Sequence, residues 1–211
     1  MDEAKFFDQV RHNPFPNKLS GPQVIGMSVI LEEGERRRTP RNHLAYMLAT
    51  AYHETAATMF PIIERGSRAY FNKYEANTPI GRRLGNTKLG DGYRYRGRGF
   101  VQLTGRTNYE RVAHILNIDA LNNPEVVLLP QNAAEILFAG MDQGWFTGKA
   151  LDDFIDGKDE GDSEDWREFV AARRIINGTD KAQKIAGHAI AFEHALEAAG
   201  YEESSTSENL T

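Results

Sequence analysis

One glutamate lies where acid–base chemistry would place a proton donor, at the end of an apolar helical stripe. The stripe is formed by side chains at helical spacing: Leu44, Met47, Leu48 and Ala51. Glu54 is the next position, so we expect it at the rim of the core and near the negative end of the helix dipole. Burial and dipole both disfavour a negative charge, and a carboxyl that keeps its proton suits a general acid. A surface glutamate on a slightly rotated helix explains the spacing equally well.

Hydrolysis of a glycosidic bond without a cofactor needs a second carboxylate, which activates water or acts as nucleophile. The downstream candidates are Glu64, Glu75 and Asp91. Glu64 follows a proline turn that would end the helix of Glu54, so the chain can fold back there. Ser67 is a nearby hydroxyl that could help to hold a water. Glu75 lies in a more polar stretch, where a solvated side chain is the default interpretation.

Metal and thiol chemistry are not supported. His53 and Glu54 begin a zinc-protease HExxH pattern, but Ala57 occupies the second histidine position. The chain has no cysteine, which excludes disulfides, thiolate nucleophiles and cysteine-based zinc sites. We therefore expect no metal and no cofactor.

Composition predicts one catalytic domain over residues 1–200, in which residues 1–40 form a helical packing segment and residues 201–211 a disordered tail. No apolar run approaches the roughly 20 residues of a membrane helix, and the N-terminus does not resemble a signal peptide. We expect a monomer that is made in the cytoplasm and does not insert into membranes. A net charge of −5 argues against nucleic acid as a partner.

Helical patterns dominate the chain. Periodicity and capping residues predict helices over residues 23–32, 42–56, 130–143 and 166–176, the second of them after Thr39 as cap and Pro40. A capping box from Thr107 to Glu110 is expected to open a further helix. The last helix is expected to start at a Thr179 or Asp180 cap and to end at about residue 199. Residues 81–105 hold seven glycines and predict loops with a short β-hairpin. This pattern predicts a mainly α protein, with a lysozyme-like architecture as one candidate.

Three segments together resemble the family 19 glycoside hydrolases, and most closely the bacterial and phage branch that includes endolysins. They are AYHETAATMFPIIERG, LGNTKLGDGYRYRGRGFVQLTGRTNY and RRIINGT, and they extend from about residue 44 to 179. The resemblance implies a lysozyme-like bilobal helical fold, with a small β-hairpin or glycine-rich region lining a substrate cleft. It also implies an inverting reaction on β-1,4-linked polymers that contain N-acetylglucosamine.

The resemblance also assigns roles to residues. Glu54 matches the general acid, and Glu64 matches the base of phage-type members, with Glu75 as its rival. An inverting pair should stand roughly 6.5–9.5 Å apart. Ser67 could orient the attacking water, and Arg98 matches a structural arginine paired with an acid. The positions that match substrate-binding residues are Tyr95, Gln102, Thr104, Asn108 and Asn177.

Peptidoglycan is the substrate that we expect, with chitin as the alternative. The basic run from Arg94 to Arg106 would suit an anionic bacterial wall, although ion pairs with nearby acids explain it equally well. A phage endolysin that reaches the wall after release would fit the absence of a recognisable signal. A non-catalytic wall-binding relative of the family is a further alternative.

Overall fold

The protein is mainly helical in a computed structural model that describes residues 1–158 and 161–201. Its α-helices are α1 (Glu3–His12), α2 (Gly21–Arg37), α3 (Arg41–Glu54), α4 (Arg68–Phe71), α5 (Pro79–Arg83), α6 (Asp91–Arg94), α7 (Arg106–Ile115), α8 (Pro130–Asp142), α9 (Asp162–Ala172) and α10 (Ala182–Ala198). Single 3-10 turns are η1 (Asn72–Tyr74), η2 (Pro124–Leu128), η3 (Leu151–Asp153) and η4 (Arg173–Ile175). The predicted mainly α class is confirmed.

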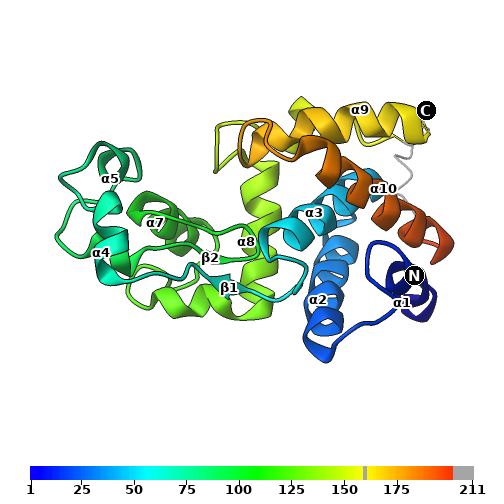
Figure 1. Ribbon diagram of the computed structural model, residues 1–211, viewed down its shortest axis with the longest axis horizontal. Helices are drawn as coiled ribbons and strands as arrows, with labels where there is room; N and C mark the ends of the chain where they lie inside the picture. The colour runs from blue at the N-terminus through cyan, green and yellow to red at the C-terminus, as the bar shows by residue number, and fades with distance from the viewer. Residues whose placement is uncertain (159–160, 202–211) are drawn as a thin grey trace, which may run out of the picture.

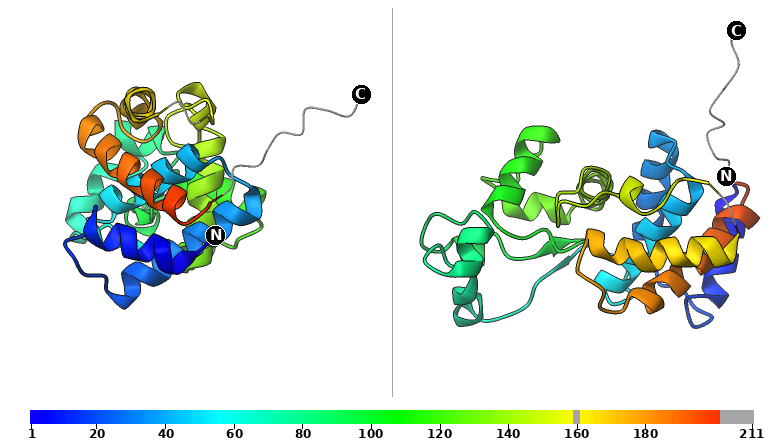
Figure 2. Two further views of the ribbon diagram at one scale, coloured as in Figure 1. Left: turned by 90° about the vertical axis from the view of Figure 1, so that its right-hand side faces the viewer. Right: turned by 90° about the horizontal axis from the view of Figure 1, so that it is seen from above.

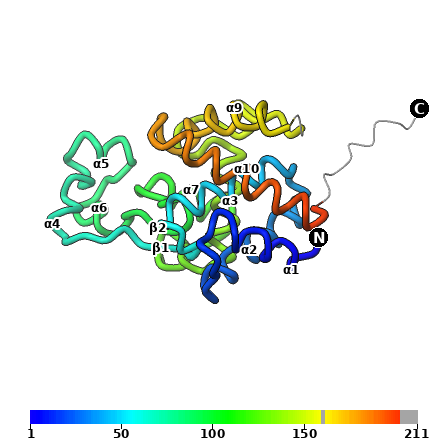
Figure 3. The backbone as a smooth tube through the Cα atoms, turned by 45° about the vertical axis from the view of Figure 1, so that its right-hand side comes forward, coloured from blue at the N-terminus to red at the C-terminus, as the bar shows by residue number. Residues whose placement is uncertain are grey.

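The helices gather into two lobes (Figures 1 and 2). One lobe contains α1, α2, α3, α9 and α10, and the other contains α4 to α7 together with the small sheet. Helix α8 packs on α2 and α3. Helices α1 and α10 lie against each other, which brings the first and last helices of the chain together (Figure 3). The expected bilobal arrangement is therefore present.

Helix α3 is the centre of its lobe. The predicted stripe from Leu44 to Ala51 is buried, but so is every other residue between Asn42 and Ala51. The helix is thus enclosed on all sides, mainly by α10, α2 and α8, and is not the amphipathic helix that a single stripe implies. Glu54 is the last helical residue, two short of the predicted end, because Ala56 and Ala57 both adopt positive φ.

Several helix starts differ from the predictions. Helix α3 begins at Arg41 with Pro40 as its cap, and the carbonyl of Thr39 instead accepts a hydrogen bond from the hydroxyl of Tyr201. Helix α7 begins at Arg106, directly after Gly105 at φ +88°, so the expected capping box does not form. Helix α2 starts earlier than predicted, at Gly21, because a capping box between Ser20 and Gln23 opens it.

The helices in the last third of the chain also shift. Helix α9 starts at Asp162 and gives way to η4, whereas the prediction was a helix over residues 166–176. Helix α10 begins directly after Lys181, a residue whose own backbone is in the left-handed conformation. Neither predicted capping side chain bonds to the start of this helix. Helix α8 runs from Pro130 to Asp142, which confirms the prediction to within one residue.

The glycine-rich segment 81–105 contains more regular structure than predicted. It includes the end of α5, all of α6, and strand β2 (Arg98–Gly99). Strand β2 pairs in antiparallel register with β1 (Ile62–Ile63), with Ile62 opposite Gly99. Arg98 also forms an isolated antiparallel bridge with Leu103, so the expected hairpin is reduced to a tight loop beside a long-range strand pair.

The terminal segments pack onto the core. Phe6 and Val10 of α1 are completely buried, and Phe15 is 2 % exposed. Tyr201 is 5 % exposed and hydrogen-bonded, which corrects the prediction that the disordered tail begins there. Residues 202–211 lie outside the described residues. Among the described helices, none is both long and apolar enough to cross a membrane.

Candidate active site

Glu54 forms an ion pair with a buried arginine. Its Oε1 accepts a hydrogen bond of 2.7 Å from Nη1 of Arg173, which lies 119 residues further along the chain in η4. The Arg173 side chain is 3 % exposed and that of Glu54 is 19 % exposed. Nε of Arg173 also donates to the carbonyl of Asp180 at 3.0 Å, so the guanidinium is held on two sides. This arrangement fixes the carboxylate at the end of α3.

The ion pair changes the electrostatics that the sequence predicted for Glu54. The sequence reasoning for Glu54 considered only burial and the end of helix α3. Arg173 acts in the opposite direction, because a guanidinium at hydrogen-bond distance stabilises a carboxylate. The structure thus gives Glu54 a positively charged partner that the sequence reasoning did not include.

His53, the neighbour of Glu54, is partly buried. Burial lowers the pKa of His53, and the nearby charge of Arg173 lowers it further, although Glu54 acts to raise it. Within residues 1–158 and 161–201, no three histidine, aspartate or glutamate side chains gather in a geometry that could hold a metal ion.

Glu64 lies in the other part of the site, directly after β1, which leads from the lobe of α3 toward that of α4 (Figure 1). Its Oε1 accepts hydrogen bonds from the hydroxyls of Tyr70 at 3.1 Å and Tyr74 at 3.2 Å. Its Oε2 accepts from the backbone N–H of Gly97 at 3.2 Å. Three hydrogen-bond donors from two segments of the chain therefore hold both oxygens of the Glu64 carboxylate in place.

The two tyrosine hydroxyls both donate to the same oxygen of Glu64. Burial raises the pKa of Tyr74, and the adjacent charge of Glu64 raises it further, although a hydrogen bond with Lys73 opposes this. The Lys73 ammonium lies 3.6 Å from the ring centroid of Tyr70 and 4.6 Å from that of Tyr74, so it holds both rings.

Two predicted substrate-binding side chains converge with Glu64 around Gly97. A methyl group placed on Gly97 would lie 2.8 Å from Oε1 of Gln102 and 3.3 Å from both Oε2 of Glu64 and Oγ1 of Thr104. Any larger residue would therefore displace these groups. Gln102 adopts φ 53°, an uncommon conformation for a non-glycine residue, and its Nε2 donates to the carbonyl of Ile62 at 3.2 Å.

The loop that carries Gln102 is stabilised by the other predicted residues. Oγ1 of Thr104 donates to the carbonyl of Gln102 at 2.7 Å, and Nδ2 of Asn108 donates to the carbonyl of Thr104 at 2.9 Å. These bonds use the donor of Thr104 and one amide hydrogen of Asn108. Nε2 of Gln102 also donates twice, to the carbonyls of Ile62 and Gly99, so the acceptor oxygens of these three side chains are the atoms available to a ligand.

The remaining predicted residues have separate positions. Asn177 is exposed just after η4, and its backbone N–H donates to the carbonyl of Arg173, on the Glu54 side. Ser67 caps α4, where its Oγ accepts from the N–H of Tyr70. Oε2 of Glu75 accepts from the N–H of Gly90 at 2.8 Å, which fastens a loop.

Tyr95 does not have the exposed position that a cleft tyrosine implies. Its side chain is 2 % exposed, and its hydroxyl donates to the carbonyl of Leu121 at 3.1 Å. Its ring lies 5.1 Å from that of Tyr109. The structure therefore assigns Tyr95 to packing. Arg98 does form the ion pair expected of it, with Glu125 at 2.6 Å.

The sequence reasoning did not identify three side chains that contact the candidate carboxylates: Arg173, Tyr70 and Tyr74. Arg173 is the first residue of the RRIINGT segment, but nothing in the sequence links it with Glu54. The two tyrosines are four residues apart, a spacing typical of one helix face, which is the one local signal that pointed to a shared partner.

Comparison with known proteins places the fold. No protein-family model matches the chain, and no curated protein matches it. Among solved structures, chitinase C from Streptomyces griseus HUT6037 superposes with a TM-score of 0.59 at 22 % identity, over 94 % of this chain and 76 % of that chain. A mutant of chitinase C superposes with a TM-score of 0.56 at 19 % identity, over the same shares. A bacterial family 19 chitinase superposes with a TM-score of 0.52 at 22 % identity, over 97 % of both chains. The chain has the fold of the family 19 chitinases.

This fold is the lysozyme-like helical architecture that the sequence predicted. At these identities the likeness establishes only the arrangement of the helices. The chemistry has to be inferred from the side chains of this chain.

Proposed function

We propose that the protein is an inverting glycoside hydrolase that cleaves β-1,4 bonds in a polymer containing N-acetylglucosamine. The observation that carries the proposal is a pair of carboxylates that the fold holds with different partners. Glu54 is held at the end of α3 by the buried guanidinium of Arg173. Both oxygens of Glu64 are held by hydrogen-bond donors, namely two tyrosine hydroxyls and one backbone N–H. The fold supports the same chemistry.

In the proposed reaction, protonated Glu54 donates its proton to the glycosidic oxygen while the bond from that oxygen to the anomeric carbon breaks. Ionised Glu64 removes a proton from a water that attacks the anomeric carbon from the opposite face. The new C–O bond has inverted configuration. Glu54 is then ionised beside Arg173 and Glu64 is protonated, and exchange with solvent restores both groups.

Four side chains are proposed to hold the sugar chain: Gln102, Thr104, Asn108 and Asn177. The first two converge with Glu64 around Gly97, and Asn177 follows the turn that contains Arg173. Ser67 is proposed to help orient the attacking water through its hydroxyl hydrogen, because its oxygen already accepts from the backbone.

We propose peptidoglycan as the polymer and a bacteriolytic, endolysin-like role, as the resemblance to the phage branch suggests. Basic side chains near Glu64 support this choice, because the bacterial wall is anionic and chitin is neutral. Chitin is the second candidate, and the observation that favours it is that the matching solved structures are chitinases.

Lysis of permeabilised Gram-negative cells, followed by turbidity beside a digest of soluble chitin oligomers, tests the proposal. The proteins compared are the wild type, Glu54→Gln, Glu64→Gln and Glu75→Gln. We expect lysis by the wild type and by Glu75→Gln, and none by the other two. Proton NMR of the first product should show the inverted anomer. Chitin cleavage without lysis would retain the mechanism and replace the substrate, and an active Glu64→Gln would remove Glu64 as the base.

A further inference from the structure

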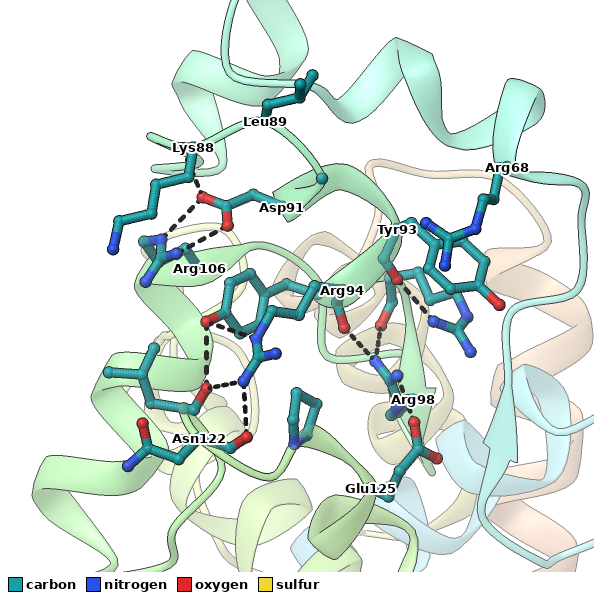
Figure 4. A pocket seen from close by; sticks show the side chains of 15 residues that line it. Arg68, Lys88, Leu89, Asp91, Tyr93, Arg94, Arg98, Arg106, Asn122 and Glu125 are labelled. Carbon is teal, nitrogen blue, oxygen red and sulfur yellow. Dashed lines mark hydrogen bonds and ion pairs between the residues drawn. The ribbon is translucent and has the colours of Figure 1, made fainter.

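A concave site lies in the lobe of α4 to α7, and residues other than the two proposed catalytic carboxylates form it. Its volume is about 880 Å³, and neither Glu54 nor Glu64 lines it. Figure 4 shows side chains from α4, from α6 and from the segment before η2 pointing into it. The charged side chains of its lining are Arg68, Lys88, Asp91, Arg94, Arg96, Arg98, Arg106 and Glu125.

The charge of this pocket is opposite to that of the protein. Six cationic side chains line it against two carboxylates, whereas the whole chain has a net charge of −5. Such a concentration of one sign in a concave site attracts ligands of the other sign. Ion pairs within the pocket decide how much of this charge is available to a ligand.

Two of the six cations are neutralised within the pocket. Arg106 forms two hydrogen bonds with Asp91, of 2.7 and 2.8 Å, and Arg98 donates to Glu125 at 2.6 Å (Figure 4). Burial alone would raise the pKa of Asp91, but hydrogen bonds from Arg106 and from two backbone N–H groups outweigh it and hold that pKa below its usual value. Both carboxylates of the lining are therefore already paired.

The other four cations have no ion pair with a carboxylate among residues 1–158 and 161–201: Arg68, Lys88, Arg94 and Arg96. Arg94 donates to the carbonyls of Leu121 at 3.2 Å and Asn122 at 2.6 Å. These bonds hold the guanidinium in place without cancelling its charge.

Arg68 and Arg96 are positioned by one aromatic ring. Their guanidinium carbons lie 4.4 and 4.0 Å from the ring centroid of Tyr93. Arg96 also donates to the carbonyl of Tyr93 at 2.7 Å. Stacking on an aromatic face orients a guanidinium and leaves its edge N–H groups available for oxyanions. The pocket thus presents pre-positioned guanidinium groups of uncompensated charge.

The position of the pocket indicates what its ligand is attached to. Gly97 donates its N–H to Glu64, and its neighbours on both sides, Arg96 and Arg98, line the pocket. Consecutive Cα atoms are about 3.8 Å apart, so two residues of the pocket wall directly flank the backbone N–H that holds the proposed base. A group bound in the pocket would therefore lie beside the polymer in the active site.

We propose that this pocket binds the carboxylate groups of the peptide branches of peptidoglycan. The proposal rests on the proposed function, and it names the feature that distinguishes this substrate from chitin. Arginine matches a carboxylate with paired N–H donors, and four unneutralised cations suit a branch with several carboxylates. A volume of about 880 Å³ holds a short peptide. A neutral sugar chain offers nothing for these charges to bind.

Direct binding tests the pocket independently of catalysis. The probe is a soluble stem tetrapeptide with free carboxylates, titrated calorimetrically into the wild type, Arg68→Gln/Arg96→Gln, and Arg82→Gln/Arg83→Gln. The last pair removes the same charge from exposed positions of α5 in the same lobe, outside the pocket. We expect the pocket variant to bind about tenfold or more weakly, because charge-assisted bonds are lost, and the α5 variant to bind like the wild type.

If the Arg96 substitution prevents folding, Arg68→Gln/Lys88→Gln replaces it, since both of those side chains are exposed. Equal weakening by the pocket and α5 variants, or no binding by the wild type, would overturn the proposal. Inorganic phosphate and a short single-stranded DNA are titrated in parallel, and tighter binding of either would overturn it in favour of a phosphate-bearing ligand.

A kinetic experiment then separates this proposal from the proposed function. The same variants are assayed on glycan strands with their peptides and on strands from which an amidase has removed them. We expect kcat/KM of the pocket variant to fall about tenfold on the first substrate only. An equal fall on both substrates would overturn the pocket's role. Inactivity of the wild type on both would overturn the proposed function, and the titration would still decide what the pocket binds.

Discussion

The ion pair between Glu54 and Arg173 should contribute measurably to both stability and activity. Replacing Glu54 with alanine removes the carboxylate from a guanidinium that is 3 % exposed, and so leaves a buried cation without its counter-charge. Replacing it with glutamine retains an amide oxygen that can still accept the 2.7 Å hydrogen bond. The two variants therefore separate the loss of charge from the loss of the bond.

The magnitude follows from the burial of the pair. An exposed ion pair contributes about 0–1 kcal/mol, and breaking a fully buried one costs about 3–5 kcal/mol. Since Arg173 is buried and Glu54 is 19 % exposed, we place Glu54→Ala between these limits, at about 1.5–3 kcal/mol. At 2–4 °C per kcal/mol for a chain of this size, Tm should fall by about 3–12 °C. Glu54→Gln should cost less, because the hydrogen bond survives.

A double-mutant cycle with Arg173→Gln, measured by urea unfolding, is the assay. The coupling energy should exceed about 1 kcal/mol, because the residues are in direct contact. Lytic activity of Glu54→Gln should fall by about 10²–10⁴-fold, the usual contribution of a general acid. A coupling energy near zero would refute the electrostatic reasoning, and a Glu54→Gln activity above about a tenth of the wild type would remove Glu54 as the acid.

Three further predictions concern other groups. Tyr70→Phe and Tyr74→Phe each remove one hydrogen-bond donor from Glu64, so each should lower kcat about five- to tenfold with little change in KM. An unchanged kcat would show that the remaining donors are sufficient to position Glu64. The fold lowers the pKa of Asp91, so the stability that Asp91 contributes is complete above the ordinary pKa of 3.8 and is lost as the pH falls through the folded pKa. Asp91→Asn should therefore lower the free energy of unfolding by about 3–5 kcal/mol at pH 7 and should flatten acid unfolding curves. Burial lowers the pKa of His188, so the unfolded chain binds a proton there before the folded one does, and the free energy of unfolding should fall as the pH drops below about 6.5. His188→Leu should reduce the slope of unfolding free energy against pH between pH 7.5 and 5.5. An unchanged slope would contradict the lowered pKa of His188.

Much of the helical framework could be read from local patterns. Helix α8 was predicted to within one residue, because Pro130 marks its start and its apolar residues recur at helical spacing. Glu54 was located at the end of α3 because the apolar stripe stops there, and this agreed with the motif that contains it. Such features depend on residues a few positions apart, whose effect on the backbone does not require the rest of the fold.

Helix starts were less predictable because tertiary contacts override local caps. Thr39 has the side chain of an N-cap, yet it is buried and its carbonyl is bound by Tyr201 from the far end of the chain. The glycine-rich segment 81–105 predicts loops with a short hairpin, but part of it forms α6, and Tyr95 directly after α6 is buried in the core. The free energy gained by burying large aromatic side chains outweighs the weak secondary-structure preferences of a glycine-rich segment.

Local patterns in the sequence predict the residue types available for acid–base hydrolysis and a chain of helices around a small β element. Which groups surround those residues depends on contacts that form only in the folded protein. The tertiary structure paired Glu54 with Arg173 across 119 positions, surrounded Glu64 with Tyr70, Tyr74 and Gly97, and left part of the basic segment without counter-charges. Electrostatic environment depends on distance in space, and residues far apart in the chain become neighbours only when the two lobes fold.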